Sequence, residues 1–210
     1  MKSIFDIEGK FFRLLSNAID CFYLNFLFII TSLPIVTLGC AWTTVLSVYL
    51  SKSRKNDRGV TKLYFEGFKA NLKHATGLEF LLLGISGVIF YIANILFRLG
   101  LLQSIGLIVV TPLLLVASLF LACGFPYIAC YKDSFANILK ICFSAFAVAP
   151  LQVVQIIVLN CGVLLLVLLS FEGMLTALYV FTFFGFSAMA FLNARLSLKV
   201  FSKLELSLEH

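Results

Sequence analysis

Amide side chains inside apolar segments are the residues of this chain best suited to binding chemistry. Gln152, Gln155 and Asn160 fall on roughly one side of a helix-length segment, and Asn25 and Asn94 lie in two earlier segments. Their amide groups could line a polar cleft and bind the hydroxyl groups of a substrate. The other interpretation is packing, because hydrogen bonds between membrane helices are a common use of such residues and contribute about 0.6 kcal/mol each.

Cysteine is the residue type most often tied to metal or redox chemistry, and the chain has six. No two of them form a Cys-x-x-Cys pair, and the only histidines are His74 and the last residue, so the spacing of a zinc site is absent. All six fall in or beside apolar segments, where cysteine behaves as a small hydrophobic residue. We therefore expect them to pack in the core and to hold no metal.

Ionisable residues inside a membrane are functional candidates, but those of this chain fall near the ends of the apolar segments. Asp20 and Glu79 each occupy the expected first turn of a helix, where the positive end of the helix dipole favours an anion. Arg98 can extend its long side chain to the membrane surface. The sequence contains no defensible serine–histidine–acid set, carboxylate pair or glycine-rich phosphate loop, so we expect no enzymatic activity and no cofactor.

The elements that would position these residues are apolar helices. Hydrophobic residues make up 61% of the chain and charged residues 12%, against roughly 45–50% and about 25% in soluble domains. A spanning helix needs about 20 apolar residues, and lipid admits only helices or closed barrels. The apolar segments are continuous rather than alternating, which predicts an all-α polytopic membrane protein with one integral membrane domain over residues 1–207. Residues 208–210 resemble the remnant of an expression tag. The uncharged runs are 21–51, 80–97, 99–131, 141–171 and 173–194.

The first uncharged run is too long for one straight span. At about 1.5 Å per residue, it would form a helix of about 46 Å against a hydrocarbon core of about 30 Å. Pro34 lacks an amide donor and disfavours helical geometry in the residue before it. Neighbouring hydroxyl groups can cap the freed backbone groups, and a glycine tolerates an unusual turn. One long helix kinked at Pro34 and two short helices in a tight hairpin are the two alternatives. The turn motif consists of Ser32, Pro34, Thr37 and Gly39.

The distribution of basic residues favours the hairpin. Lys and Arg of short loops concentrate on the cytoplasmic side. A hairpin with a cytoplasmic amino terminus places every basic residue except Arg98 on that side, whereas a kinked span would move Lys2, Lys10 and Arg13 across the membrane. This partition also accounts for the net charge of +6 without a nucleic-acid partner. We expect both termini in the cytoplasm and six hydrophobic helices, the first two short and either spanning or re-entrant: about 17–33, 37–51, 78–97, 106–131, 149–171 and 174–196.

Two segments between the apolar runs have the periodicity of amphipathic helices. In residues 61–76 one face is apolar and the other carries lysines, which predicts a helix on the cytoplasmic membrane surface with its lysines toward anionic headgroups. Residues 133–146 repeat the pattern more weakly. Plain topological anchoring is the alternative role of both segments. The residues expected to contact lipid or a partner are Lys62, Phe65, Phe68, Lys69, Asn71 and Lys73.

Two motifs resemble a known family. The sequence SLPIVTLGCAWTTVL (32–46), followed by YFEGFKANLKHATG (64–77), is similar to the YesL-like family of bacterial membrane proteins, the domain of unknown function 624 (DUF624). Its members share a Pro-x-x-Thr-x-Gly turn after the first helix and a Phe-Lys-x-Asn-x-Lys segment. The chain departs from the pattern at Cys40, and at Cys130, where the family resemblance leads us to expect a basic residue. The resemblance implies no established chemistry, only an association with carbohydrate-utilisation operons and ATP-driven sugar importers.

Together these observations predict a non-enzymatic accessory or regulatory protein of the bacterial cytoplasmic membrane, linked to carbohydrate uptake. Its expected partners are a bilayer with anionic headgroups and the membrane subunits of a sugar ABC importer, and a homo-oligomer stays open. One alternative is a small-solute transporter or channel, whose cavity the five amide residues would line. Another is a membrane scaffold that binds lipid headgroups through Lys62, Lys69 and Lys73.

Overall fold

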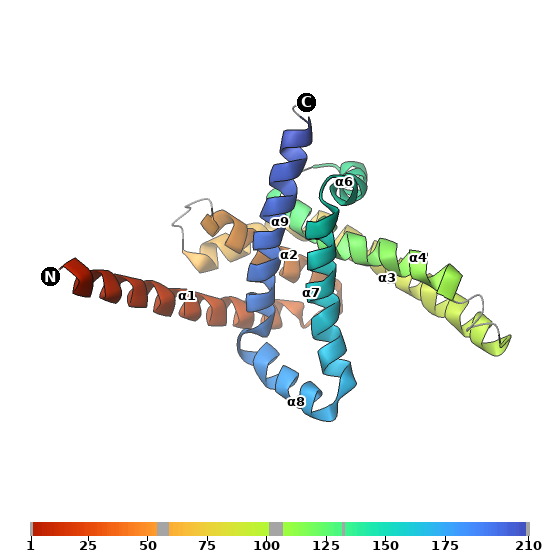
Figure 1. Ribbon diagram of the computed structural model, residues 1–210, viewed down its shortest axis with the longest axis horizontal. Helices are drawn as coiled ribbons and strands as arrows, with labels where there is room; N and C mark the ends of the chain where they lie inside the picture. The colour runs from red at the N-terminus through yellow and green to blue at the C-terminus, as the bar shows by residue number, and fades with distance from the viewer. Residues whose placement is uncertain (1, 54–58, 101–106, 132, 209–210) are drawn as a thin grey trace.

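The computed structural model describes residues 2–53, 59–100, 107–131 and 133–208, and these residues are almost entirely helical, with no β-strand among them (Figure 1). The predicted tag remnant lies outside the described residues, apart from the backbone of Leu208. So do the side chains of Lys2, Lys10 and Arg13, which entered the topology prediction. The elements are α1 (Lys2–Ser32), the 3-10 turn η1 (Ile35–Thr37), α2 (Leu38–Ser53), α3 (Val60–Arg98), α4 (Leu107–Leu119), the π-helical segment η3 (Phe120–Gly124), α5 (Phe125–Cys130), α6 (Phe135–Val148), α7 (Pro150–Leu169), α8 (Phe171–Val180), the π-helical segment η4 (Phe181–Gly185) and α9 (Phe186–Leu208).

The first uncharged run folds back on itself at Pro34. α1 ends at Ser32 and α2 begins at Leu38, with only the short turn η1 between them. An ion pair joins Asp20, well before the end of α1, to Lys52, near the end of α2, so the two helices run antiparallel. The hairpin that the basic residues favoured is therefore confirmed, and the single kinked helix is not formed.

The segment 61–76 does not form a separate helix on the membrane surface. It is the first half of α3, a helix of 39 residues that continues through the predicted span 78–97. Gly77 is the only helix-weakening residue at the junction, and one glycine costs a helix only about 1 kcal/mol. At about 1.5 Å per residue, α3 is about 58 Å long, so it extends beyond a hydrocarbon core of about 30 Å or crosses it at a steep tilt.

Five helical stretches of the described residues are long and apolar enough to cross a membrane, or six if one bent pair counts as a span. The bent pair is α6 and α7, and the chain bends by 108° between them. Pro150 is the first residue of α7, a position where the missing amide donor costs nothing. The prediction of an all-α polytopic protein with about six apolar helices is confirmed. The five stretches are Leu15–Ser32, Ile35–Lys52, Val60–Arg98, Ile108–Cys130 and Phe171–Ser207.

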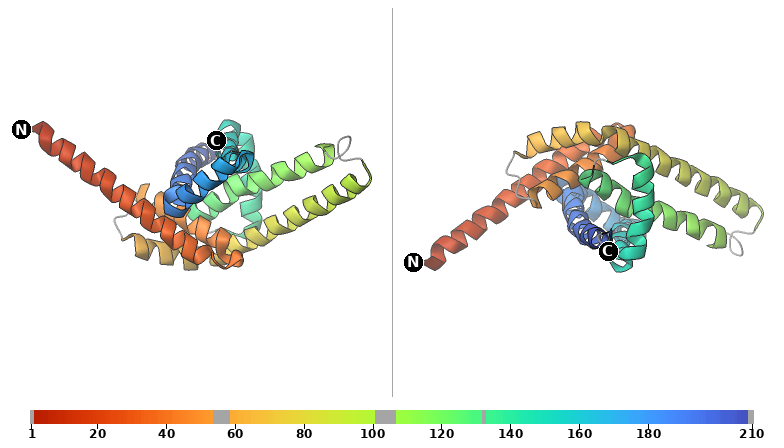
Figure 2. Two further views of the ribbon diagram at one scale, coloured as in Figure 1. Left: turned by 90° about the horizontal axis from the view of Figure 1, so that it is seen from below. Right: turned by 90° about the horizontal axis from the view of Figure 1, so that it is seen from above.

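α2 lies at the centre of the molecule and packs on α3, α5 and α9. Cys40, Ala41, Val45 and Leu46 of α2 are completely buried. Figure 2 shows α1 and the hairpin of α3 and α4 diverging from this centre to opposite sides. α7 and α9 run side by side, and α8 joins their lower ends in the view of Figure 1.

Two π-helical segments interrupt the helices, and each has the sequence Phe-x-x-x-Gly. A π turn widens the helix and weakens its regular hydrogen-bond ladder. Both glycines stand where no side chain fits. A Cβ at Gly185 would lie 2.8 Å from the ring of Phe181, and one at Gly124 would lie 2.7 Å from Cδ2 of Leu78.

Candidate functional site at the Pro34 turn and Glu79

Hydroxyl side chains hold the turn between α1 and α2. Thr37 Oγ1 lies 2.6 Å from the carbonyl oxygen of Thr31 and 2.8 Å from that of Pro34, so its proton caps the end of α1. The hydroxyl groups of Thr31 and Tyr64 are 2.6 Å apart and tie the turn to α3. Ser32 donates its hydroxyl proton back to a carbonyl of α1. Every hydroxyl group of the turn motif thus satisfies a carbonyl group that the end of the helix frees.

Gly39 is the point where α2, α3 and α5 meet. Its backbone N–H donates to Oε2 of Glu79 at 3.1 Å. A Cβ at this position would lie 2.9 Å from Cε1 of Phe125 and 3.2 Å from Cβ of Glu79. The glycine therefore permits a close approach of three helices. It does not supply the unusual backbone turn that we predicted, because Gly100 is the only described glycine with a positive φ.

Glu79 is a carboxyl group buried inside a candidate membrane span, with 8% of its surface exposed. We predicted it in the first turn of its own helix, but α3 begins at Val60 and Glu79 lies in its middle. The carboxyl group instead faces the N-terminal turn of α2, whose second residue is Gly39. Its Oε2 thus lies at the positive end of the dipole of α2. A buried carboxyl group with an N–H donor can hold and release a proton, which is a frequent role of ionisable residues inside membranes.

Small residues bring α2 and α3 together beyond this point. A Cβ at Gly67 would lie 2.7 Å from the hydroxyl oxygen of Ser47, so the two helices approach closely there as well. Cys40 Sγ donates to the carbonyl oxygen of Phe68 at 3.3 Å, and Tyr64 is completely buried. The turn and Glu79 are thus part of a closely packed two-helix unit.

A family model covers this unit. Residues 21–94 match the model of the family described as a protein of unknown function, DUF624. The chain is therefore similar to the DUF624 family over about a third of its length. No curated protein and no solved structure matches the chain. The DUF624 segment contains the second half of α1, the turn, α2 and most of α3, which are the elements that build the site.

The residues predicted to contact lipid or a partner are divided between two faces of α3. The three lysines, Lys62, Lys69 and Lys73, are exposed, and so is Phe65. Asn71 is buried, with 7% of its surface exposed, and is therefore unavailable to a lipid or a partner. Asn71 lies on the same face of α3 as Tyr64 and Ala75, and this face packs against α2. Phe68 is partly buried against the core.

Asn25 and Asn94 do not share a cavity. Asn25 is completely buried, and its Nδ2 donates to the carbonyl oxygens of Phe181 and Thr182, each at 2.9 Å. Its Oδ1 accepts from the backbone N–H of Ser187 at 3.1 Å. Asn25 thus holds the π-helical segment η4 in place. Asn94 is exposed near the far end of α3 and donates to a carbonyl of its own helix.

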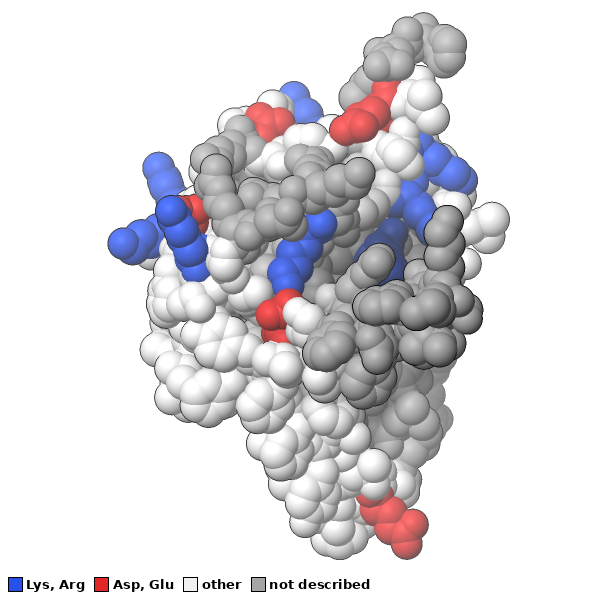
Figure 3. All heavy atoms as spheres, turned by 90° about the vertical axis from the view of Figure 1, so that its left-hand side faces the viewer, with Lys and Arg blue, Asp and Glu red and all other residues white. Residues whose placement is uncertain are grey.

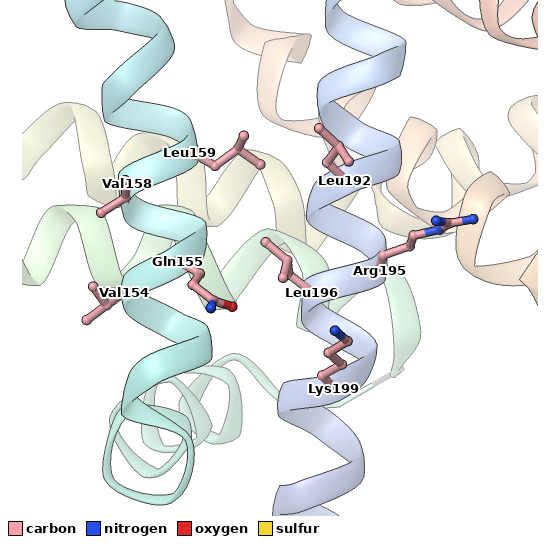
Figure 4. A pocket seen from close by; sticks show the side chains of 8 residues that line it. All are labelled: Val154, Gln155, Val158, Leu159, Leu192, Arg195, Leu196 and Lys199. Atoms are coloured by element: carbon pink, nitrogen blue, oxygen red, sulfur yellow. The ribbon is translucent and has the colours of Figure 1, made fainter.

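The other three amide residues lie on α7 and have different environments. Asn160 and Asn193 of α9 exchange side-chain hydrogen bonds of 3.3 and 3.1 Å, which fix the register of the two helices. Gln152 Oε1 is buried and has no hydrogen-bond partner among the described residues. Gln155 lines a groove between α7 and α9 (Figure 4). Of the five residues predicted to form a polar cleft, Gln155 alone lines this groove.

The partners of these amides on α9 were not singled out from the sequence. Asn193 and Ser187 both lie in the last uncharged run, where a polar residue is an available signal of helix pairing. Ser187 also lies 2.6 Å from the hydroxyl group of Tyr49 through its own side-chain oxygen. The pairing itself could not be predicted, because it depends on which helices become neighbours.

The six cysteines form no disulfide. Cys40, Cys123 and Cys142 are buried in the core, as expected for small hydrophobic residues. The other three do not follow the expectation of core packing, because Cys21 and Cys130 are half-buried and Cys161 is exposed. Among the described residues, no group of three or more His, Cys, Asp or Glu side chains is placed to hold a metal ion.

Asp133 lies outside the candidate spans and connects α5 to α6. Its Oδ1 accepts from Nδ2 of Asn137 at 3.0 Å and from the N–H of Ser134 at 2.8 Å, and its Oδ2 accepts from the hydroxyl group of Tyr127 at 3.0 Å. These bonds favour the anion. The bond from Asn137 contributes most to holding the pKa of the Asp133 carboxyl below its usual value.

Proposed function

We propose that the protein is a non-enzymatic accessory or regulatory protein of the bacterial cytoplasmic membrane that docks on the membrane subunits of a sugar ABC importer. The observation that carries this proposal is the hairpin of α3 and α4, which projects away from the other helices (Figure 1). The docking surface is the projecting half of α3, residues 80–98.

This half of α3 has the features of a helix-packing surface that the chain itself leaves open. Gly84 and Gly87 are exposed, and a Cβ at either position would have no neighbour within 4 Å. Small residues favour helix association in membranes because they let two backbones approach closely. Large apolar residues surround the two glycines, and these are Phe80, Leu83, Val88, Phe90 and Tyr91, all exposed.

The opposite end of α3 is fixed. Tyr64 and Glu79 bind groups at the turn and at the start of α2, so the projecting half extends from a firmly packed base. The link to sugar uptake rests on the resemblance to the YesL-like family and its association with carbohydrate-utilisation operons. A rigid helix with an open small-residue face is a suitable means of attachment to a transporter.

The proposal includes a cytoplasmic location of both termini. Figure 3 views the molecule from the left-hand side of Figure 1, and in this view the basic side chains gather in the upper half. Below them, the described surface visible in this view is white except for one acidic side chain near the middle and another at the lower tip. Because Lys and Arg concentrate on the cytoplasmic side, the upper part of the molecule, with the carboxyl terminus, faces the cytoplasm.

Photo-crosslinking in native membranes tests the docking surface. A photoreactive residue at Leu83 of α3 is expected to form an adduct with an importer membrane subunit, because this exposed position borders Gly84. The same residue at Leu178 of α8 is the matched control, since Leu178 is also exposed and apolar. Adducts with lipid alone from Leu83, together with unchanged sugar uptake in a deletion strain, would rule out the proposal.

Gln152 favours a second candidate function, a small-solute transporter or channel. Its buried Oε1 lacks a hydrogen-bond partner, and the hydroxyl group of a solute would satisfy it. A variant with its native cysteines replaced and one cysteine at position 152 or 155 would separate the two functions. If the protein is a transporter, a water-soluble thiol reagent should label the introduced cysteine, and the transported solute should slow this labelling. An absence of labelling at both positions would contradict it.

A further inference from the structure

The groove between α7 and α9 is lined mainly by apolar side chains and has a volume of ≈ 680 Å³. Figure 4 shows Leu159 of α7 and Leu192 of α9 extending toward each other across it. Leu196 and Gln155 also extend into the gap between the two helices. The groove belongs neither to the Pro34 turn nor to the projecting half of α3.

Lys199 gives the groove a positive charge that nothing in the described part of the chain neutralises. Its side chain is exposed, and no described residue forms an ion pair with it. It lines the groove from α9, across from Gln155 of α7 (Figure 4). Arg195 also lines the groove, but the end of its side chain points away from the gap, with the guanidinium carbon 4.3 Å from the centre of the Phe191 ring. No acidic residue lines the groove, so a bound anion would complete the charge balance.

The polar and apolar parts follow one another along the groove. The paired Asn160 and Asn193 fix the register of the antiparallel helices, so Gln155 and Lys199 lie toward one end and Leu159 and Leu192 toward the other. Lys199 and Leu192 are about 10 Å apart along α9. An amphiphile with its charge at one end and its chain at the other matches this order.

We propose that the groove binds one anionic phospholipid. The phosphate accepts hydrogen bonds from the ammonium group of Lys199 and the amide of Gln155, and an acyl chain lies along Leu159, Leu192 and Leu196. A phosphate is the anion that membranes supply in this position, and a lysine near the surface attracts it. The apolar walls select a lipid over a free phosphate, because inorganic phosphate would leave them without a partner.

Native mass spectrometry of the full chain in detergent tests this proposal with phosphatidylglycerol and phosphatidylcholine as probes. We expect one bound phosphatidylglycerol and a dissociation constant about five- to tenfold lower than that for phosphatidylcholine, as one charged contact contributes. Lys199→Gln should remove this preference and Lys199→Arg should keep it. Lys203→Gln is the matched control, because Lys203 lies one turn further along α9 and does not line the groove.

Three results would overturn the proposal. Equal binding of the two lipids would show that Lys199 does not select a phosphate. If Lys203→Gln loses as much of the preference for phosphatidylglycerol as Lys199→Gln, the general positive charge of α9 causes the preference. A dimer whose formation excludes phosphatidylglycerol and is lost in Leu192→Asn would make a second copy of the chain the occupant. The retained preference of Lys199→Arg separates loss of charge from misfolding.

Discussion

Gly39 sets how closely α2, α3 and α5 approach one another. Replacing it with alanine places a methyl group 2.9 Å from Cε1 of the buried Phe125 ring and 3.2 Å from Cβ of Glu79, which cannot move without shifting α3. We expect Gly39→Ala to lower the free energy of unfolding by about 1–3 kcal/mol, the usual effect of overpacking a core. Thermal unfolding of the purified protein in detergent measures the change.

Alanine variants of two other glycines are the controls for this prediction. Gly67→Ala should cost less than Gly39→Ala, because its methyl group meets the hydroxyl oxygen of Ser47, which can rotate away. Gly84→Ala should be neutral or slightly stabilising, because nothing lies near it and alanine is the better helix former. A Gly39→Ala variant as stable as Gly84→Ala would contradict the assigned role of Gly39.

Asn25 bonds to η4 through Nδ2 and to the start of α9 through Oδ1. Asn25→Ala leaves the carbonyl groups of Phe181 and Thr182 and the N–H of Ser187 without these bonds. Because unsatisfied buried groups are costly, we expect a loss of about 1–3 kcal/mol of unfolding free energy. Asn94→Ala should change stability by less than about 0.5 kcal/mol, because its bond is exposed and local. Similar melting temperatures for the two variants would refute the assignment.

At this scale the sequence predicts hydroxyl roles better than contacts between helices. Thr31, Ser32 and Thr37 bond to carbonyl groups near them in sequence, and such local bonds follow from spacing alone. The contacts of Gly39 and Asn25 join residues far apart in sequence. Their partners depend on which helices pack together, and neither spacing nor composition contains that information.

Moving to the elements, the hairpin of α1 and α2 brings Asp20 beside Lys52. With all native cysteines replaced by alanine, cysteines at positions 20 and 52 should form a disulfide on mild oxidation. Cysteines at positions 30 and 52 should not, since Ile30 lies near the turn at the other end of α1. Gel mobility before and after reduction measures both. Crosslinking of the second pair alone would mean that the helices do not run antiparallel.

Asp133 predicts a pH effect at the connection of α5 and α6. Hydrogen bonds to the anion lower the pKa of its carboxyl group in the folded state. Its contribution to stability is therefore present above the pKa of the unfolded chain and is lost as the pH falls through the lower folded value. Asp133→Asn should remove this part of the pH dependence of the melting temperature. If the melting temperatures of the wild-type protein and Asp133→Asn fall identically at acid pH, Asp133 does not contribute to the pH dependence.

Helix positions were predictable because an uncharged run has few other options in lipid. The turn at Pro34 was predictable as well, because proline and the basic residues indicated the same place. The continuity of α3 was not. The polar face of residues 61–76 indicated a surface helix, but its apolar stripe, with Tyr64 and Ala75, packs on α2 instead. Periodicity identifies a buried face and leaves open what covers it.

For the molecule as a whole, the partition of charge predicts the orientation in the membrane. A reporter enzyme active only in the periplasm should be inactive when fused ahead of Lys2 or after Leu208, and active when inserted after Gly100. Lys and Arg favour the cytoplasmic side, and Arg98 alone is expected on the other. An active fusion ahead of Lys2 would reverse the topology, and a reporter active only in the cytoplasm is the complementary control.

The unbroken length of α3 has a mechanical consequence. The helix packs on α2 at one end, and its other end projects with α4 beside it, so it works as a lever whose fulcrum lies near Leu78. About 30 Å separates Leu78 from Arg98 along the axis, and a rotation of ~5° at the fulcrum swings the tip by ~3 Å. Protonating Glu79 would act at the fulcrum, and pulling on α1 through the bond between Thr31 and Tyr64 would act on the short arm. The end of α3 at Arg98 would then move further than the end at Val60, and it would displace a partner bound there.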